Sequence, residues 1–591
     1  MMKRRTLGLA ALAGLLAGLG LSVAPVAATQ AAGARVLLVG TYNGVTGGYH
    51  SIQAAVNAAR PGDWILVGPG DYHEQADAAN PSWPAGVWIS KPRLHVRGMD
   101  RNQVIVDGTN AGAPTCSSAA GDQNPGPNGQ GRNGIEVFGK GFKANNVSID
   151  NLTVCNFLTD TSGSNGNQIW WNGGDGSGQI GMSGYHGSYL TATSTYSNYV
   201  NYPAGSYGIF SSNATQGSWT HSYASNMSDS SFYIGACQQK CDAVMNDDHG
   251  QNSALCISTT NAGGYLLIEN TECDHNKTGP VSNSQNNDDA PSPQIGLCSS
   301  DPSEPQTGAL GTKSCTVWMD NYIHDNNNPN VPGNGTSGLA GGGPVGTGMI
   351  LAGTTYVTLY HNTVTNNNSW GELIVDLPDQ ETGPANCQGG IFVPSPAGVC
   401  YYQAFGNVSL NNKFKNNGAY GNPSNGDIGL ATIAHNPGNC FAGDTNPGGL
   451  TTDPAGIETL PTYQPVHKMC TTANAGDEGP LAGEALCATQ LVAPCPTLNT
   501  LCDINPSLPC IQQAPCAAIC YPRPTPFTLT MPPAQTTMPN PCAGVPANGF
   551  CPTAQGSASS VLLSAIPGGA LVLGAALAVT RRRQRRDAFA G

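Results

Sequence analysis

Acidic residues recur at a fixed distance from asparagines in the middle of the chain. Asp274 and Asp325 each stand four residues after an asparagine, Asn270 and Asn321. If these segments are neighbouring turns of one coil, equivalent Cα atoms lie about 4.8 Å apart. Two carboxylates separated by about 5 to 9 Å can act as acid and nucleophile, or as acid and base, in a glycoside hydrolase. Asp274 and Asp325 are therefore our candidate catalytic pair.

Further polar residues lie near this pair in sequence or in the repeat. The candidate catalytic set is completed by Asp248, His249 and His324. Candidate ligands for a cation are Asp247, Asp288 and Asp289. Ca²⁺ is the cofactor we expect if one is present, because it prefers carboxylate and carbonyl oxygens. Solvated turn residues of a scaffold give the same pattern, so catalysis, a metal site and a purely structural role all stay open.

Aromatic residues gather between positions 170 and 233, although they form only 7% of the chain. Sugar rings stack on such side chains through their C–H faces. Trp170 and Trp171 are consecutive, so in an extended segment at most one of them faces inward. With Tyr185 they are our candidate substrate-binding residues. Filling of the core is the alternative role for this group.

The charge balance excludes several partners and reactions. The chain has 37 acidic and 24 basic residues, a net charge of −13, and an acidic body repels nucleic acid. A lyase acting on uronates must neutralise the substrate carboxylate, but no arginine occurs between Arg132 and Arg523. If the protein is an enzyme, glycoside hydrolysis is therefore favoured over polysaccharide lysis, unless Ca²⁺ supplies the positive charge.

An internal repeat predicts the elements that position these residues. Asn198, Ser222, Asn246 and Asn270 are spaced 24 residues apart, and hydrophobic columns keep the same step. A short strand, a polar bend and another short strand in each repeat describe one coil of a parallel β-solenoid. We expect stacked asparagine amides at the bends, each donating to one neighbouring coil and accepting from the other.

The beginning of the predicted β-helix carries a recognisable pattern. Residues 52–59 have an i, i+3, i+4, i+7 apolar pattern after Ser51, which predicts a short helix with an N-cap that covers the first coil. With Pro61-Gly62-Asp63, the run from Gly68 to Glu74 and Leu94-His95-Val96-Arg97-Gly98, this opening resembles the pectin lyase-like superfamily of right-handed parallel β-helices. The centre of the chain is similar to uncharacterised secreted bacterial members. The resemblance implies the fold, while the superfamily spans many reactions and some members with none.

The two ends predict export and a membrane anchor. Residues 1–28 have the basic, apolar and small-residue regions of a signal peptide. Residues 557–580 are apolar and precede an arginine cluster, which predicts one transmembrane helix and a cytoplasmic tail at 581–591. Between them we expect an all-β parallel β-helix over 29–435. A Cys- and Pro-rich stalk, or a small disulfide-rich region, should fill 436–556.

Taken together, these patterns predict a cell-surface β-helix anchored by its C-terminal helix. Its expected partner is an extracellular carbohydrate polymer, which it binds and, if hydrolytic, cleaves with an acidic pair. A non-catalytic adhesive or structural surface protein is the alternative.

Overall fold

Short parallel strands dominate the computed structural model. It describes residues 33–175, 177–198, 201–237, 240–285, 296–333, 338–379, 387, 389–393, 398–432, 438–460, 463, 479–489, 521–522 and 524–552. The expected signal peptide (1–28), transmembrane helix (557–580) and cytoplasmic tail (581–591) lie outside these residues. None of the described helices is long and apolar enough to cross a membrane.

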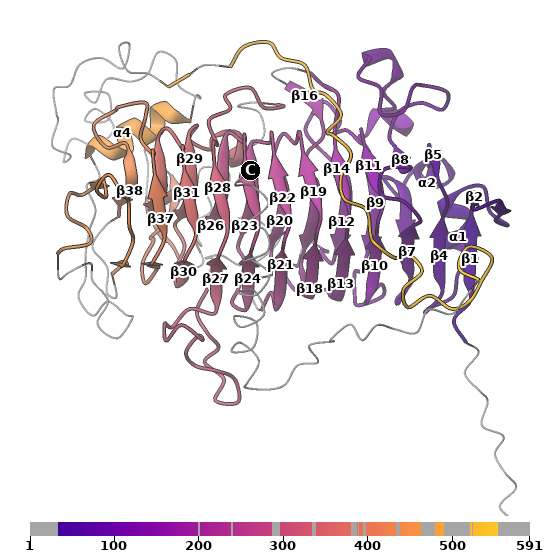
Figure 1. Cartoon of the computed structure of the whole chain (residues 1–591), viewed down its shortest axis with the longest axis horizontal. Coiled ribbons are helices and arrows are strands. Elements are labelled where there is room, and N and C mark those ends of the chain that lie inside the picture. Colours follow the sequence, from indigo (N-terminus) through magenta and orange to yellow (C-terminus); the bar gives the residue numbers. More distant parts are fainter. Residues whose placement is uncertain are drawn as a thin grey trace, which may run out of the picture. The chain divides into compact units, whose positions relative to one another are not determined.

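Three long parallel sheets run along the molecule (Figure 1). Sheet 1 contains β1 (Val36–Val39), β4 (Trp64–Val67), β7 (His95–Gly98), β10 (Val147–Asp150), β13 (Met182–Ser188), β18 (Ala214–Thr220), β21 (Ala243–Asn246), β24 (Leu266–Glu269), β27 (Thr316–Met319), β30 (Val357–Tyr360), β36 (Val408–Leu410) and β39 (Cys440–Ala442). Sheet 2 contains β5 (Gly70–Tyr72), β8 (Val104–Asp107), β11 (Thr153–Cys155), β14 (Thr191–Thr193), β19 (Tyr223–Ser225), β22 (His249–Gln251), β25 (Glu272–Asp274), β28 (Tyr322–His324), β31 (Thr363–Thr365) and β37 (Lys413–Lys415). Sheet 3 contains β6 (Ala85–Ile89), β9 (Asn133–Phe138), β12 (Ile169–Asn172), β17 (Ile209–Ser212), β20 (Ser230–Gly235), β23 (Leu255–Thr260), β26 (Thr278–Asn283), β29 (Thr347–Ala352), β32 (Trp370–Val375), β38 (Gly426–Ala431) and β40 (Thr452–Asp453).

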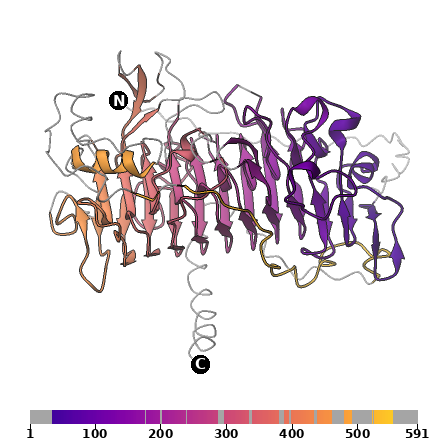
Figure 2. The same cartoon turned by 90° about the horizontal axis from the view of Figure 1, so that it is seen from above.

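Smaller elements decorate this framework (Figure 2). The antiparallel additions are β2 (Thr41–Tyr42) with β3 (Val45–Thr46), β15 (Ser197–Asn198) with β16 (Asn201–Ala204), and β33 (Leu377–Asp379) and β34 (Ile391–Val393) with β35 (Val399–Tyr402). The helices are α1 (Ile52–Ala58), α2 (Ala76–Ala79), α3 (Gly338–Gly341) and α4 (Gly479–Ala488), with 3₁₀ turns at Ala120–Asp122 and Pro127–Gly129.

Between the two end coils, each coil contributes one strand to sheet 1, then to sheet 2, then to sheet 3, which defines a parallel β-helix. Strands β24, β25 and β26 form one such coil, and each pairs in parallel with the strand of the same sheet in the next coil. The fold implied by the superfamily resemblance is therefore confirmed as a parallel β-helix. Alternation along the strands sends every second side chain into a continuous core. In sheet 2 the inward residues include Ala224, Cys273 and Ile323, all buried.

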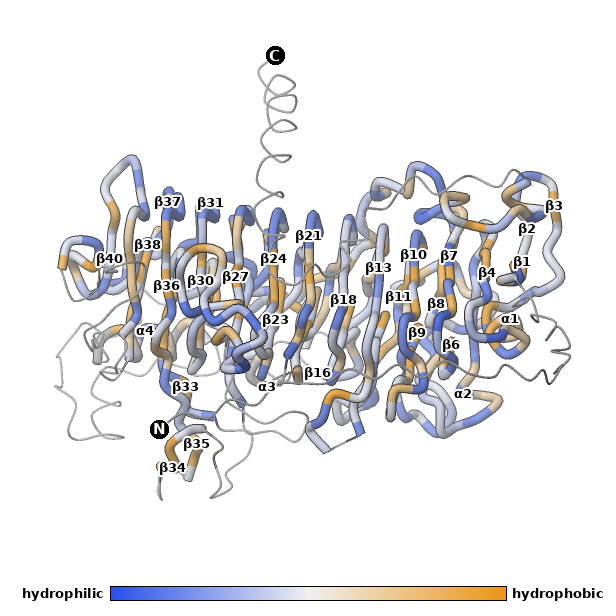
Figure 3. The backbone as a smooth tube through the Cα atoms, turned by 90° about the horizontal axis from the view of Figure 1, so that it is seen from below, coloured by the Kyte–Doolittle hydropathy of each residue, from blue (hydrophilic) through white to orange (hydrophobic). Residues whose placement is uncertain are grey.

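The expected amide ladders are present at two of the bends, where polar residues form many of the turns in Figure 3. Between sheets 1 and 2, the Asn321 side-chain amide donates to Asn362 Oδ1 at 2.9 Å, and Asn362 donates to the next coil in the same way. Between sheets 2 and 3, Asn276, Asn326 and Asn367 form a second ladder. Each amide satisfies buried backbone groups of the adjacent coil, so the asparagines hold the bends in register.

The capping helix is confirmed at the N-terminal end. Helix α1 follows Ser51, whose hydroxyl accepts a hydrogen bond from the amide of Ala54 at 3.1 Å. Glu74 adds a second cap, because its carboxylate accepts from the amides of Ile52 and Gln53. The apolar face of α1 packs into the same core as the first strands.

The coils differ in length, and this shifts the predicted register. Thr220 pairs with Asn246, and Asn246 pairs with Glu269, so the 24-residue column through Ser222 and Asn270 does not hold. Asn198 lies in the antiparallel strand β15, outside the coil strands. Turns and inserted loops of unequal length cause the difference. The repeat therefore predicts the fold correctly but misaligns neighbouring coils by a residue or two.

The described part of the segment 436–556 packs on the β-helix instead of extending from it. Strands β39 and β40 continue sheets 1 and 3 beyond the expected boundary at residue 435. Residues 524–552, which we call the strap, run back along the coils (Figure 1). The backbone amide of Thr525 donates to Asn330 Oδ1, and the side-chain amide of Asn226 donates to the carbonyl of Thr530. At the N-terminal end of the β-helix, Phe550 packs in the same apolar cluster as Leu66.

Six disulfides join the described residues: Cys116–Cys155, Cys237–Cys241, Cys256–Cys273, Cys298–Cys315, Cys387–Cys400 and Cys542–Cys551. The sequence alone left their connectivity open. Cys542–Cys551 closes the end of the strap, and Cys256–Cys273 lies in the core between β23 and β25.

Candidate functional site

The outer face of sheet 2 carries two rows of polar and aromatic side chains. Strands β19, β22, β25 and β28 are each three residues long, so the first and third residues face outward and the second faces the core. Figure 1 shows β19, β22 and β28 in this face. The first row is Tyr223, His249, Glu272 and Tyr322; the second is Ser225, Gln251, Asp274 and His324.

Asp274 is the most heavily hydrogen-bonded carboxylate of this face. Its Oδ1 accepts from His249 Nε2 at 2.7 Å, and its Oδ2 accepts from Gln251 Nε2 at 2.9 Å and His275 Nδ1 at 2.7 Å. Burial of the carboxyl opposes ionisation, but the hydrogen bonds outweigh it and lower the pKa of Asp274 to about 2. Asp274 is therefore ionised at neutral pH and has no proton to donate.

His324 lies between two other carboxylates. Its Nε2 is 3.1 Å from Glu272 Oε1, and its Nδ1 is 2.8 Å from Asp325 Oδ2. Burial alone would lower the pKa of His324. The hydrogen bonds with the two carboxylates raise it by more than burial lowers it, so the net shift is upward. The hydrogen bond from His324 in turn lowers the pKa of Glu272. Both shifts favour an imidazolium held between ionised carboxylates.

Two tyrosines flank these charges. The ring of Tyr322 stacks on His324 with 3.9 Å between centroids, and 43% of Tyr322 is exposed. Tyr223 meets His249 edge-on and donates its hydroxyl to Gln251 Oε1 at 2.9 Å. Tyr223 is buried, so the exposed ring of Tyr322 is the aromatic surface that adjoins these fixed acceptors and donors. We name His249, Glu272, Asp274, Tyr322 and His324 the sheet 2 site.

Asp274 and Asp325, the candidate catalytic pair, do not occupy equivalent positions of neighbouring coils. Asp274 pairs in register with His324, and Asp325 falls one residue later, in the bend. Both oxygens of Asp274 already accept hydrogen bonds. His249 and His324, two other members of the candidate set, do lie at the site. Glu272, Gln251 and Tyr322 were not predicted from the sequence, although the outer-inner-outer patterns Glu272-Cys273-Asp274 and Tyr322-Ile323-His324 contain two of them.

Asp247 and Asp248 point to different environments in one bend. Asp248 is 2% exposed and accepts from the backbone amide of Ser222 at 2.7 Å, and burial raises its pKa. It occupies a ladder position inside the turn and cannot contact a substrate. Asp247 is exposed and lies 3.2 Å from His221. The other two candidate calcium ligands, Asp288 and Asp289, lie outside the described residues.

Of the three candidate substrate-binding aromatics, two belong to the core. Trp171 and Tyr185 are fully buried, and the Trp171 indole donates to the carbonyl of Val147. Strand β12 turns Trp170 outward, as the alternation of consecutive residues requires, and it stacks on Phe210 at 5.0 Å. The prediction that Trp171 and Tyr185 bind substrate was wrong, because the strand register turns both side chains into the core. The sequence did not define that register.

Trp170 belongs to an aromatic row on the outer face of sheet 3. The register places Trp88, Glu136, Trp170, Phe210 and Tyr233 side by side on successive coils. Glu136 is 2% exposed, and burial raises its pKa to about 7 despite hydrogen bonds from two asparagine amides. Most of this row is covered, so it offers little surface to a ligand.

No protein-family model matches the chain, and no curated protein matches it. Among solved structures it is similar to the A-module of the mannuronan C-5 epimerase AlgE4 from Azotobacter vinelandii, with 12% identity over 68% of this chain and 87% of that one and a TM-score of 0.37. It is also similar to the GH136 lacto-N-biosidase from Eubacterium ramulus, with 11% identity over 65% and 64% of the two chains and a TM-score of 0.35. A tailspike protein of an E. coli bacteriophage in complex with a pentasaccharide gives 12% identity over 70% and 60% and a TM-score of 0.34. The assignment as a parallel β-helix rests on the strand pairing of this chain.

Proposed function

We propose that this protein is a cell-surface β-helix that binds an extracellular carbohydrate polymer at the sheet 2 site. The observation that carries the proposal is the exposed ring of Tyr322, stacked on His324 and beside the carboxylate of Glu272. A sugar ring packs its C–H face on tyrosine, and its hydroxyls donate to carboxylates. Rows repeated from coil to coil suit a polymer better than a single small molecule.

The charges of the site favour a neutral or amino-sugar polymer. Glu272 and Asp274 belong to the site and Asp325 contacts its His324, and no arginine occurs in the chain between Arg132 and Arg523. A polyuronate would be repelled in the absence of a divalent cation. The disulfides, the predicted signal peptide and the predicted anchor support display on the outside of the cell.

Binding without hydrolysis is the form of the proposal that we favour. A hydrolase of the two-carboxylate type needs one protonated carboxyl group and one free carboxylate. The pKa values of Asp274 and Glu272 are both lowered, so both groups are ionised, and the hydrogen bonds of Asp274 leave it poorly placed as a nucleophile. These observations favour binding without cleavage over the acidic-pair mechanism.

A glycan array with the purified full chain tests the proposal. We expect retention of neutral or amino-sugar glycans with and without Ca²⁺, and at least about tenfold weaker retention by Tyr322→Ala and by Glu272→Gln. Trp170→Ala is the matched control, since it removes a ring from the outer face of sheet 3, and it should bind as the wild type does. Thermal melts confirm that each variant is folded. Absence of glycan binding, or equal retention by the wild type and both sheet 2 variants, would overturn the proposal. Release of reducing ends from the glycan would show that the protein hydrolyses it and would contradict binding without hydrolysis.

A further inference from the structure

A second cluster of acidic and histidine residues lies at the N-terminal end of sheet 2. Asp71 is in β5, His73 directly follows that strand, and Asp107 ends the neighbouring strand β8. One ligand atom from each of the three residues lies within 4.8 Å of the other two. The sheet 2 site, on β22, β25 and β28, is several coils away along the same sheet.

The orientation of His73 leaves a lone pair facing a carboxylate. His73 Nδ1 is 3.0 Å from the carbonyl oxygen of Thr109, which can only accept, so Nδ1 carries the proton. In the neutral ring Nε2 is then an acceptor, and it lies 3.7 Å from Asp71 Oδ2. Two acceptors facing each other favour a cation between them. A histidine that donates one nitrogen to a carbonyl and offers the other is the usual arrangement of a metal ligand.

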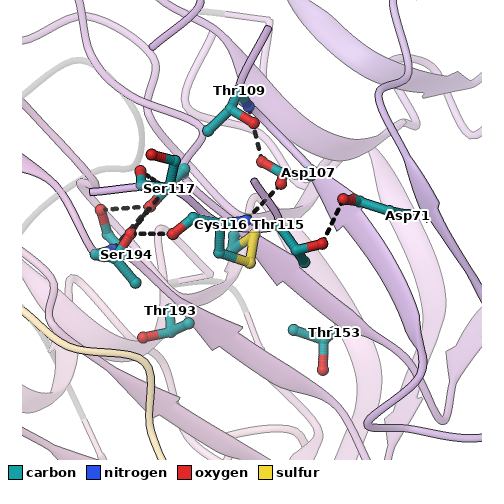
Figure 4. Close-up of a disulfide and its surroundings, with 12 residues drawn as sticks. Asp71, Asp107, Thr109, Thr115, Cys116, Ser117, Thr153, Thr193 and Ser194 are labelled. Atoms are coloured by element: carbon teal, nitrogen blue, oxygen red, sulfur yellow. Dashed lines mark hydrogen bonds between the residues drawn. A yellow bond between two sulfur atoms is a disulfide. The ribbon is translucent and has the colours of Figure 1, made fainter. Parts of the chain in front are cut away.

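Asp107 is held rigidly on the other side of the cluster. It is fully buried, and its two oxygens accept from the amides of Thr109 at 2.8 Å and Cys116 at 2.6 Å. The Cys116–Cys155 disulfide ties the loop that supplies these donors to strand β11, as Figure 4 shows. The hydroxyl of Thr115, from the same loop, donates to Asp71 Oδ2 at 2.6 Å. The ligand atoms are therefore positioned before any ligand arrives.

A buried hydroxyl beside the cluster supplies an independent observation. Thr109 Oγ1 is buried and has no hydrogen-bond partner among the described residues. Figure 4 shows Thr109 directed toward Asp107. An unpaired buried hydroxyl is costly. A water molecule bound to an ion at this cluster would satisfy it.

We propose that Asp71, His73 and Asp107 bind a divalent transition metal ion such as Zn²⁺. An imidazole nitrogen beside two carboxylates suits Zn²⁺ and its neighbours, whereas Ca²⁺ and Mg²⁺ prefer oxygen ligands alone. Cys116 and Cys155 also lie close to Asp107, but their disulfide removes them as thiolate ligands. The exposed side of Asp71 leaves room for water or for a ligand group on the metal. The proposal does not depend on the proposed carbohydrate binding.

Titration of the full chain with Zn²⁺ and Co²⁺, without reductant, tests this site. We expect one ion to bind per chain with a rise in the thermal midpoint, and a Co²⁺ spectrum without thiolate charge transfer. Asp71→Asn and His73→Gln should each weaken Zn²⁺ binding by at least about tenfold. His186→Gln is the matched control, because this histidine lies in sheet 1, away from the cluster, and its Nδ1 contacts the Ser218 hydroxyl. Melts without metal confirm that the variants fold.

Two results would overturn the metal site. One is a wild-type chain that binds neither ion more tightly than the double variant Asp71→Asn/His73→Gln. The other is binding that both single variants leave unchanged, because the ion would then sit elsewhere, for example among the histidines of the sheet 2 site.

Discussion

A buried carboxyl group on the outer face of sheet 3 has a raised pKa, whereas one on the outer face of sheet 2 has a lowered pKa. On sheet 3, Glu136 accepts hydrogen bonds from the amides of Asn133 and Asn172, and burial raises its pKa to about 7. On sheet 2, Asp274 accepts from one amide and two imidazoles, and its pKa falls to about 2. The neighbours differ as well, since Glu136 lies in a row of rings.

This difference shows that an acidic residue on the outside of a β-helix does not by itself make a site. Glu136 lies between tryptophans in its row, and two neutral amides donate hydrogen bonds to its carboxyl oxygens. These hydrogen bonds do not stabilise the charged form enough to offset the cost of burial. Imidazoles, which can carry positive charge, keep Asp274 ionised at a surface that stays partly open. The first arrangement stabilises the packing of coils, and the second presents fixed charges to a ligand.

The largest expected effect is a difference in stability between alanine variants of the two consecutive tryptophans of β12. Trp171→Ala should lower the free energy of unfolding by about 3 to 5 kcal/mol, because a fully buried ring leaves a cavity. Trp170→Ala, on the outer face of sheet 3, should cost clearly less. Denaturant unfolding of both variants measures the difference, and equal losses would contradict the assigned strand register.

Glu136→Gln should change how stability depends on pH. The unfolded chain releases this proton near pH 4.5, but the folded protein keeps it up to about pH 7. The free energy of unfolding of the wild type therefore falls through this window, by roughly 3 kcal/mol at most. The variant should match the wild type near pH 4 and exceed it at pH 8. Thermal melts across this range check the prediction, and parallel curves would refute it.

Asp274→Asn should show a smaller effect of opposite sign. A lowered pKa means that the ionised group stabilises the fold above about pH 4, and that this contribution is lost as the pH falls toward 2. We expect the variant to lose about 2 kcal/mol at pH 7, with the gap narrowing in acid. Asp247→Asn, an exposed carboxylate of a neighbouring bend, is the control and should change little. A gap independent of pH would argue against the histidine partnership.

The fold could be predicted because its signals are local and repeated. The apolar alternation, the asparagine bends and the cap at Ser51 each appear in a few consecutive residues, and all of them hold in the structure. The site could be predicted only in part, because it depends on register between coils. A slip of one residue replaces Asp325 by His324 as the neighbour of Asp274, and it moves every side chain to a different partner.

The same limit explains the aromatic residues and the strap. Alternation requires that Trp170 and Trp171 face opposite ways, but only the structure shows which one is buried. The strap is held by scattered contacts, among them those to Asn330, Asn226 and Leu66, which are far away in sequence. No periodic pattern in a proline-rich segment records such contacts.

The most direct test of the sheet 2 site is the position of a bound oligosaccharide. The structure of the full chain should be determined with the glycan that the array retains most strongly. We predict a sugar ring on Tyr322, with hydroxyl groups hydrogen-bonded to Glu272 and its neighbours across successive coils. A sugar bound at the outer face of sheet 3, or at any position that leaves Tyr322 uncontacted, would contradict the proposed function.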